Sequence, residues 1–114
     1  MSLIHILDEI VLAAPDVARV LALLDGSYLP GLAARPSLVL RARWVSPPVA
    51  VDGVDNTLWL LWEVSEPYGY YAMRGAAGPE VAQFWAEVDA LARKRRRHVL
   101  QDAALALAMP VEAP

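Results

Sequence analysis

Two ionisable side chains near the start of the chain, His5 and Glu9, have the types and spacing that acid–base chemistry needs. A histidine exchanges protons near neutral pH, and a carboxylate in an apolar wall can orient the imidazole or act as a base. Both lie in Leu3–Leu12, an apolar run that reads as a β-strand, and residues four apart in a strand share one face. We predict His5 as a general acid or base assisted by Glu9; the alternative is a structural histidine bonded to backbone.

Two further ionisable residues are candidates for the same cavity. Glu63 lies with Trp59 on one side of an apolar segment, and His98 begins the last predicted strand. Asp8 is left out of this set because it lies on the opposite face of its strand from the histidine. The alternative for each candidate is a position at a strand end that reaches solvent.

Aromatic side chains are numerous enough to line a cavity for a flat hydrophobic ligand, since such pockets are mainly apolar with few polar groups. A neighbouring cation, Arg74, could neutralise a carboxylate on that ligand. The alternative is that most of these rings belong to the core or to a subunit interface. The candidate aromatic residues are Tyr28, Trp44, Trp59, Trp62, Tyr68, Tyr70 and Tyr71.

One run of charge stands out, Arg93–His98, with the sequence RKRRRH. Nucleic-acid or phosphate binding is one interpretation. We favour a solvated end of a helix, where cations stabilise the negative end of the helix dipole. The chain as a whole carries a net charge of −3, and no aromatic residues alternate with the run. We therefore predict no nucleic-acid partner.

The composition indicates one domain with a large apolar surface. The chain has 114 residues, of which 57% are hydrophobic, and its mean hydropathy is +0.35. No segment approaches the roughly 18–20 unbroken apolar residues of a membrane span, so we predict no membrane contact and, without an export signal, a cytoplasmic location. Cysteine is absent, and two distant histidines make a weak metal site, so we expect neither metal nor cofactor.

The apolar segments follow the order β-α-β-β-α-β, which is that of the ferredoxin-like sandwich. We predict an α+β fold with a four-stranded antiparallel sheet and two main helices on one face, spanning residues 1–104, followed by a tail over 105–114. Both faces of the central strands are apolar and the helices can cover only one, so the other face should pair with a second copy. The predicted strands are Leu3–Leu12, Ser37–Ser46, Thr57–Val64 and Arg97–Asp102, and helical apolar spacing appears over Val17–Tyr28 and Val81–Ala92.

A family resemblance follows from the segments YLPGLAARP, LVLRARWVSPP, TLWLLWEV, YYAMRG and VAQFWAEVDAL, which come after a strand that bears His5. Over roughly residues 3–102 the pattern resembles the dimeric α+β barrel superfamily, and within it the NIPSNAP-like group. The resemblance implies a homodimer built by pairing two ferredoxin-like sheets, with a pocket in each subunit. It implies a range of activities, among them cofactor-free oxygenation, polyketide cyclisation, isomerisation and haem degradation.

Within that superfamily, His5 matches the first-strand histidine of the polyketide cyclase branch. The haem-degrading branch is a poor match, because the single asparagine, Asn56, lies in a predicted loop rather than in a strand. We therefore expect a small cofactor-independent enzyme that moves a proton next to the carbonyl of a hydrophobic aromatic or polycyclic compound, as a cyclase, isomerase or monooxygenase. The alternative is a non-catalytic dimeric module that binds a hydrophobic ligand or a partner protein; anion binding through Arg93–Arg97 is a third hypothesis.

Overall fold

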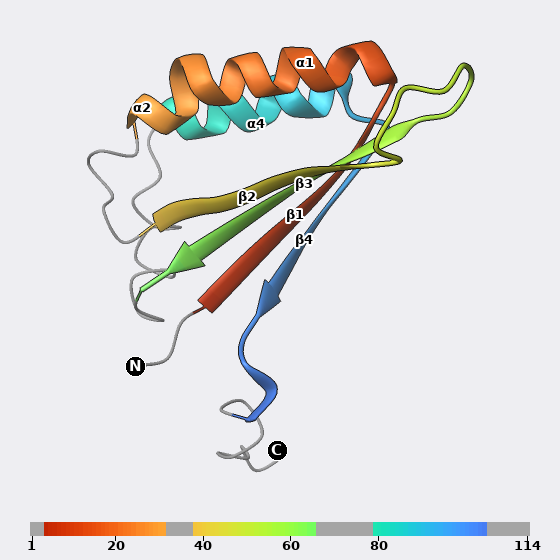
Figure 1. The fold of residues 1–114 in the computed structure, drawn as a ribbon. Coiled ribbons are helices and arrows are strands. Elements are labelled where there is room, and N and C mark those ends of the chain that lie inside the picture. The colour runs from red at the N-terminus through yellow and green to blue at the C-terminus, as the bar shows by residue number, and fades with distance from the viewer. Residues whose placement is uncertain (1–3, 32–37, 66–78, 105–114) are drawn as a thin grey trace, which may run out of the picture.

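A computed structural model describes residues 4–31, 38–65 and 79–104 of the chain. The predicted order of strands and helices is confirmed in these residues, and the helices form one layer over one face of the sheet (Figure 1). In chain order the elements are β1 (Ile4–Leu12), α1 (Ala14–Leu23), the π-helical turn η1 (Leu24–Tyr28), α2 (Leu29–Gly31), β2 (Leu38–Ser46), β3 (Asn56–Val64), α4 (Pro79–Leu91) and β4 (Lys94–Leu100).

The four strands form one antiparallel sheet in the order β2-β3-β1-β4. The first strand of the chain is therefore central, and both of its neighbours come later in the sequence. The register places His5 directly opposite Glu63 on β3 and opposite Leu100 on β4. This pairing decides which side chains can meet across the sheet, because directly opposite residues share a face.

Burial alternates with period two along the central strands β1 and β3. Their even-numbered residues face the helices and are buried, apart from the partly buried Ile4, while their odd-numbered residues face away and are partly exposed. Each central strand thus has one face in the core and one face that the described helices do not cover. The buried apolar core consists of Ile6, Ile10, Leu12, Val20, Leu24, Tyr28, Leu38, Leu58, Leu60, Trp62, Val64, Phe84 and Val88.

Helical backbone runs without a break through α1, η1 and α2. Pro15 lies in the first turn, where its missing N–H leaves no bond unmade, and Asp16 stabilises the positive end of the dipole. Gly26 lies in the π-helical turn, where the Ser27 hydroxyl donates to the Leu23 carbonyl oxygen at 2.8 Å. No helix in the described ranges is long and apolar enough to cross a membrane.

Strand β2 contains a β-bulge between Leu40 and Ala42. Leu40 pairs with Trp62 and Ala42 pairs with the preceding residue, Leu61, so that Arg41 is the extra residue. A bulge of this kind turns the following side chains to the opposite face of the strand. Trp44 is consequently opposite Trp59, on the side away from the helices. Simple alternation would place it with Leu38 and Leu40 instead.

The prediction that Arg93–His98 closes the second helix is wrong. Helix α4 ends at Leu91, and Lys94–Leu100 form strand β4, which begins three residues before the predicted fourth strand. The long stems of arginine and lysine fit a half-covered edge strand as well as a helix end. A run of five cations therefore carried no periodic signal to separate the two.

Every second cation of β4 pairs with a carboxylate on the helix side of the sheet. Arg95 donates two hydrogen bonds to Asp89, and its guanidinium lies 4.6 Å from the centre of the Trp85 ring. Arg97 lies 5.2 Å from the same ring and donates to both carboxylate oxygens of Asp8, at 2.8 and 3.0 Å. The charge run is thus two alternating sets of cations, of which one set is structural.

Asp8 is fully buried in the core, at 0% exposure. The indole N–H of Trp62 donates to one of its oxygens at 2.9 Å, and Arg97 donates a hydrogen bond to each of the two oxygens. A carboxylate in an apolar core is tolerated only when its oxygens are paired in this way. The acidic residue that sequence analysis set aside is therefore an anchor of the core.

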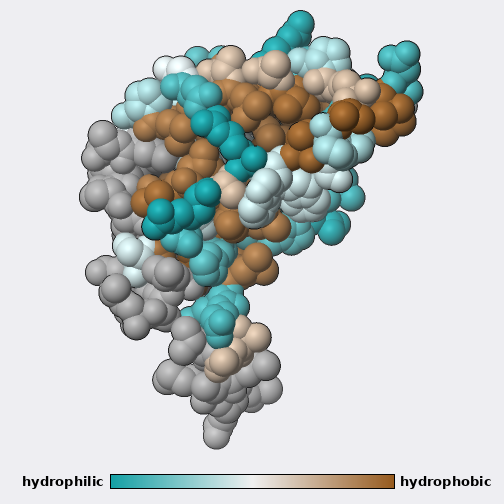
Figure 2. Space-filling model, in the orientation of Figure 1, coloured by the Kyte–Doolittle hydropathy of each residue, from teal (hydrophilic) through white to brown (hydrophobic). Residues whose placement is uncertain are grey.

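The loop between β2 and β3 presents apolar side chains to solvent. Val49, Val51 and Val54 are 64%, 46% and 46% exposed, and Figure 2 shows hydrophobic atoms at the surface where Figure 1 draws this loop. At its base, buried Asn56 donates to the Pro47 carbonyl oxygen at 2.9 Å. The base of the loop is anchored while its tip offers apolar surface.

Candidate functional site

The candidate site is the sheet face that the described helices leave uncovered, which we call the open face (Figure 1). It combines aliphatic and aromatic side chains with histidines, carboxylates and three cations. The strand register assigns to it His5, Leu7, Glu9 and Val11 of β1; Val39, Arg41, Ala42 and Trp44 of β2; Thr57, Trp59, Leu61 and Glu63 of β3; and Lys94, Arg96, His98 and Leu100 of β4.

His5 meets Glu63 rather than Glu9. The Nδ1 atom of His5 lies 3.9 Å from Oε1 of Glu63, and the two side chains are 33% and 23% exposed. The other oxygen of Glu63, Oε2, accepts a hydrogen bond of 2.6 Å from Nε of Arg41. Strands β1, β2 and β3 therefore bring an imidazole, a carboxylate and a guanidinium into one line.

Glu9 shares the open face with His5, as alternation predicts, but its contact is with His98. The two atoms Nε2 of His98 and Oε1 of Glu9 lie 3.1 Å apart, within hydrogen-bond distance. The described contacts therefore form two separate histidine–carboxylate pairs, His5 with Glu63 and His98 with Glu9. His98 lies within β4 rather than at its start. In the register, Glu9 is also opposite Arg96.

The aromatic candidates divide between the two sides of the sheet. Trp44 and Trp59 are opposite each other on the open face, and Trp44 is 55% exposed. Tyr28, also predicted as a cavity residue, lies on the other side of the sheet from these two tryptophans. It is buried on the helix side, with its ring centre 4.5 Å from that of Phe84 and 5.6 Å from that of Trp62. Packing of three large rings into the core accounts for its position.

Four predicted site residues, Tyr68, Tyr70, Tyr71 and Arg74, lie outside the residues that the structure describes. Sequence analysis missed Arg41, which donates to Glu63. Alternation along β2 places it on one face with Val39, but its partner follows only from the pairing of β2 with β3. A hollow of about 670 Å³ beside β2 is lined by Leu29, Leu38, Val39, Leu40, Arg41, Ala42, Arg43 and Trp44.

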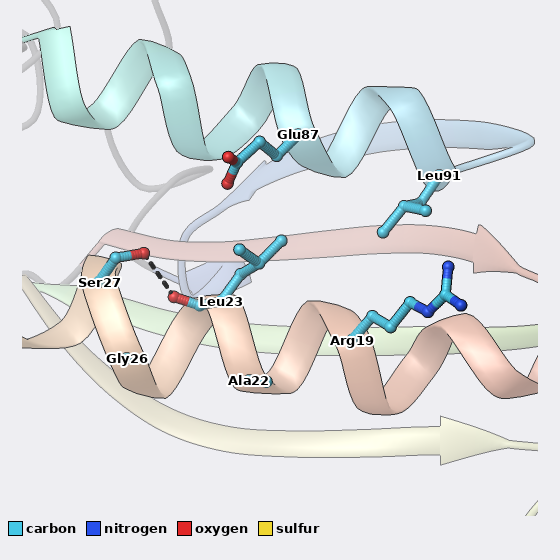
Figure 3. A pocket seen from close by; sticks show the side chains of 7 residues that line it. All are labelled: Arg19, Ala22, Leu23, Gly26, Ser27, Glu87 and Leu91. Carbon is cyan, nitrogen blue, oxygen red and sulfur yellow. Dashed lines mark hydrogen bonds between the residues drawn. The ribbon is translucent and has the colours of Figure 1, made fainter.

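A separate groove lies between α1 and α4, on the other side of the sheet (Figure 3). It has a volume of about 590 Å³ and is mostly apolar, with the side chains of Leu23 and Leu91 inside it and the charged groups of Arg19 and Glu87 at its sides. The Ser27 hydroxyl in this groove is bonded to backbone. Among the described residues that line this groove, Arg19 and Glu87 are the ionisable ones.

Within residues 4–31, 38–65 and 79–104, no three histidine or carboxylate side chains converge as a metal site requires. The open face instead holds two histidine–carboxylate contacts, His5 with Glu63 and His98 with Glu9. Such pairs suit the transfer of a proton better than the binding of a cation.

Comparison with known proteins was made by family, by sequence and by structure. No family model matches the chain, and neither does any curated protein. Among solved structures, an uncharacterised NIPSNAP domain protein from Burkholderia xenovorans is 20% identical, with a TM-score of 0.64 over 90% of this chain and 95% of the other. A dimeric ferredoxin-like protein from an uncultured marine organism is 13% identical, with a TM-score of 0.62 over 90% and 88%.

A third similar structure carries the name of a candidate antibiotic biosynthesis monooxygenase, from Bacteroides thetaiotaomicron. It is 12% identical, with a TM-score of 0.57 over 89% of this chain and 88% of the other. At these identities the likeness concerns the fold alone. The fold is that of NIPSNAP proteins and dimeric ferredoxin-like proteins, so the resemblance inferred from the sequence is confirmed at the level of the fold.

Proposed function

We propose that two copies of the chain pair through their open faces and enclose a chamber, as in a dimeric α+β barrel. The support is the composition of that face, where the apolar side chains of Leu7, Leu61 and Trp44 lie beside partly exposed charged groups. Apolar side chains on both faces of the central strands favour a second covering layer. The dimeric ferredoxin-like protein of similar fold is consistent with this arrangement.

The chamber is proposed to bind a hydrophobic aromatic carbonyl compound and to move a proton next to its carbonyl group. The observation that carries this proposal is the His5–Glu63 contact of 3.9 Å on a face that also presents Leu61 and Trp59. Catalytic hydrogen bonds are often long before the ligand binds and shorten when charge develops. Glu63 faces Nδ1, which leaves Nε2 of His5 for the substrate.

The proposed step is a simple enolisation. The C–H bond next to the carbonyl breaks, its electron pair forms the enolate, and the proton moves to Nε2 of His5. The imidazolium is then stabilised by Glu63. Return of the proton to a different carbon completes an isomerisation. In a ligand with a second carbonyl, the enolate carbon instead attacks that carbonyl carbon, its C=O π bond opens, and the imidazolium gives the proton to the resulting alkoxide. No oxidant or reductant is required. The second pair, Glu9 and His98, is proposed to contact the same ligand, between walls formed by Trp44 and Trp59.

A second candidate function is ligand binding without catalysis. It is favoured by the Glu9–His98 contact of 3.1 Å, because two groups that satisfy each other are less available to a substrate. In that case the tryptophans of the open face would provide most of the affinity. The two functions differ in one measurable property, the exchange of ligand protons.

The test is deuterium exchange into 2-tetralone and benzoylacetone, followed by proton NMR in D₂O. We expect the wild-type protein to accelerate exchange next to the carbonyl, and His5→Gln to lower that rate by about 100-fold or more, the lower limit for a general base. Arg43→Gln is the control, because Arg43 lies in the same sheet, on β2, but bonds Asp25 on the helix side.

Exchange at the buffer rate in the wild-type protein would exclude catalysis on these compounds. Tryptophan fluorescence would then decide whether they bind, since Trp44 and Trp59 both lie on the open face. Equal acceleration by the wild-type and His5→Gln proteins would remove His5 from the mechanism.

A further inference from the structure

The bulge in β2 sends two arginines, Arg41 and Arg43, to opposite sides of the sheet. In a regular strand they would share a face, because they are two residues apart. Here Arg41 bonds Glu63 on the open face at 2.6 Å, and Arg43 donates to both oxygens of Asp25 on η1 at 3.0 and 3.1 Å. Bulges often redirect a side chain beside a functional site. Arg41 stays on the face of Val39, the residue opposite Glu63, whereas the bulge moves Arg43 to the helix side. Of the two arginines, Arg41 is therefore the one beside Glu63.

The carboxylate of Glu63 is divided between two neighbours. Its Oε2 accepts the short bond from Arg41, and its Oε1 is left facing Nδ1 of His5 at 3.9 Å. A charge-assisted hydrogen bond to the planar guanidinium restricts rotation of the carboxylate far more than a solvent contact would. Arg41 is 56% exposed and Glu63 only 23%, so the anchor reaches inward from the edge strand.

We propose that Arg41 is a positioning residue, which acts on His5 through Glu63. It holds Oε1 toward Nδ1, so that the neutral imidazole carries its hydrogen on Nδ1 and presents Nε2 to the chamber. This inference deepens the proposed function and depends on it for its catalytic meaning. The arrangement itself is a property of the resting protein, and it is measurable without any substrate.

The test is long-range ¹⁵N–¹H NMR of the imidazole rings, at a pH where both are neutral. The chain has two histidines, so His98→Gln assigns the spectrum. We expect the wild-type His5 to show hydrogen on Nδ1, and Arg41→Gln to give a mixture of the two tautomers. Arg41→Lys restores the charge without the planar fork and should restore the tautomer only in part. Arg43→Gln is the matched control and should leave the ring signals of His5 unchanged.

Identical His5 signals in the wild-type and Arg41→Gln proteins would overturn the inference, as would an Nε2–H tautomer in the wild type. With the exchange assay in place, Arg41→Gln should lower the rate constant at saturation by about 10-fold while changing the apparent KM little. A changed tautomer in a protein that exchanges no ligand protons would refute the proposed function and leave the positioning role intact. Unchanged signals in an active enzyme would do the reverse.

Discussion

At the scale of single residues, the most consequential group is Asp8, a fully buried carboxylate. It joins a central strand to an edge strand through Arg97 and to the core through the indole of Trp62. Its partner is only partly buried, with 33% of the Arg97 side chain exposed. The two members of the pair should therefore respond differently when the other is removed.

We predict that Arg97→Met lowers the free energy of unfolding by about 3 kcal/mol, because it leaves a buried carboxylate without its cation. Asp8→Asn should cost less, because Asn keeps an acceptor for Trp62 and Arg97 can still reach solvent and the Trp85 ring. The double variant should lie close to Asp8→Asn. Urea unfolding at one fixed protein concentration measures all three. Strictly additive losses would contradict a direct interaction.

Residue types and alternation were sufficient to place His5 and Glu9 on one face and Asp8 on the other. They were insufficient to find partners, because a partner depends on strand register and not on sequence spacing. Glu63 was among the candidates, but its link to His5 follows from the β1–β3 pairing. The contact of Arg41 with Glu63 likewise follows from the β2–β3 pairing, and the bulge that turns Arg43 and Trp44 over has no signal in the sequence of β2.

At the scale of elements, α4 and β4 are joined by Asp89 and Arg95. Two hydrogen bonds from Arg95 lower the pKa of Asp89 below its ordinary value, and the positive charge of Arg95 adds to this effect against the opposing effect of burial. A carboxyl group with a lowered folded-state pKa stabilises the protein above its unfolded pKa of about 4. That contribution disappears as the pH falls through the folded-state value.

We therefore predict that Asp89→Asn lowers stability near neutral pH by less than about 1 kcal/mol, since solvent screens this half-exposed pair. The difference between the wild type and Asp89→Asn should shrink as the pH falls below about 4. Thermal unfolding followed by circular dichroism from pH 7 to pH 2.5 measures it. Asp52→Asn in the β2–β3 loop is the control, and a difference that stayed constant with pH would contradict the assignment.

The elements themselves were largely predictable, because strands and helices in this chain have clear apolar periods. The exception is β4, where Arg93–His98 offers no apolar period at all. Arg95 of this strand contacts Trp85 and Asp89 of the neighbouring helix α4. Such a contact exists only in three dimensions. The same limit applies to Tyr28, whose place in the core is set by its packing against Phe84.

At the scale of the whole molecule, the main prediction concerns the open face of the sheet. We predict a homodimer with a mass near twice the 12.4 kDa of one chain, measured by size-exclusion chromatography with light scattering. Leu61→Glu and Trp44→Ser should each weaken association, because large buried side chains at the centre of an interface contribute most of its energy. The Val49 tip of the β2–β3 loop extends the apolar surface beyond the sheet.

Two controls make this measurement decisive. Ala90→Glu places the same new charge on the exposed side of α4 and should leave the mass unchanged. Trp44 is already 55% exposed in the single chain, so Trp44→Ser should fold normally even where Leu61→Glu does not. A wild-type protein that remained a monomer at high concentration would contradict the pairing of open faces. Dimers that survived both open-face variants would place the interface elsewhere.

The order of strands in the sheet has a consequence for synthesis on the ribosome. Strand β1 is made first, yet it pairs with β3 and β4, and the buried Asp8 meets its cation 89 residues later. A nascent chain that lacks β4 holds a carboxylate in what must become the core, with nothing to balance it. The carboxylate of Asp8 therefore has its cation only after β4 has been made. Chains cut short before Lys94 should be recognised as unfolded and degraded.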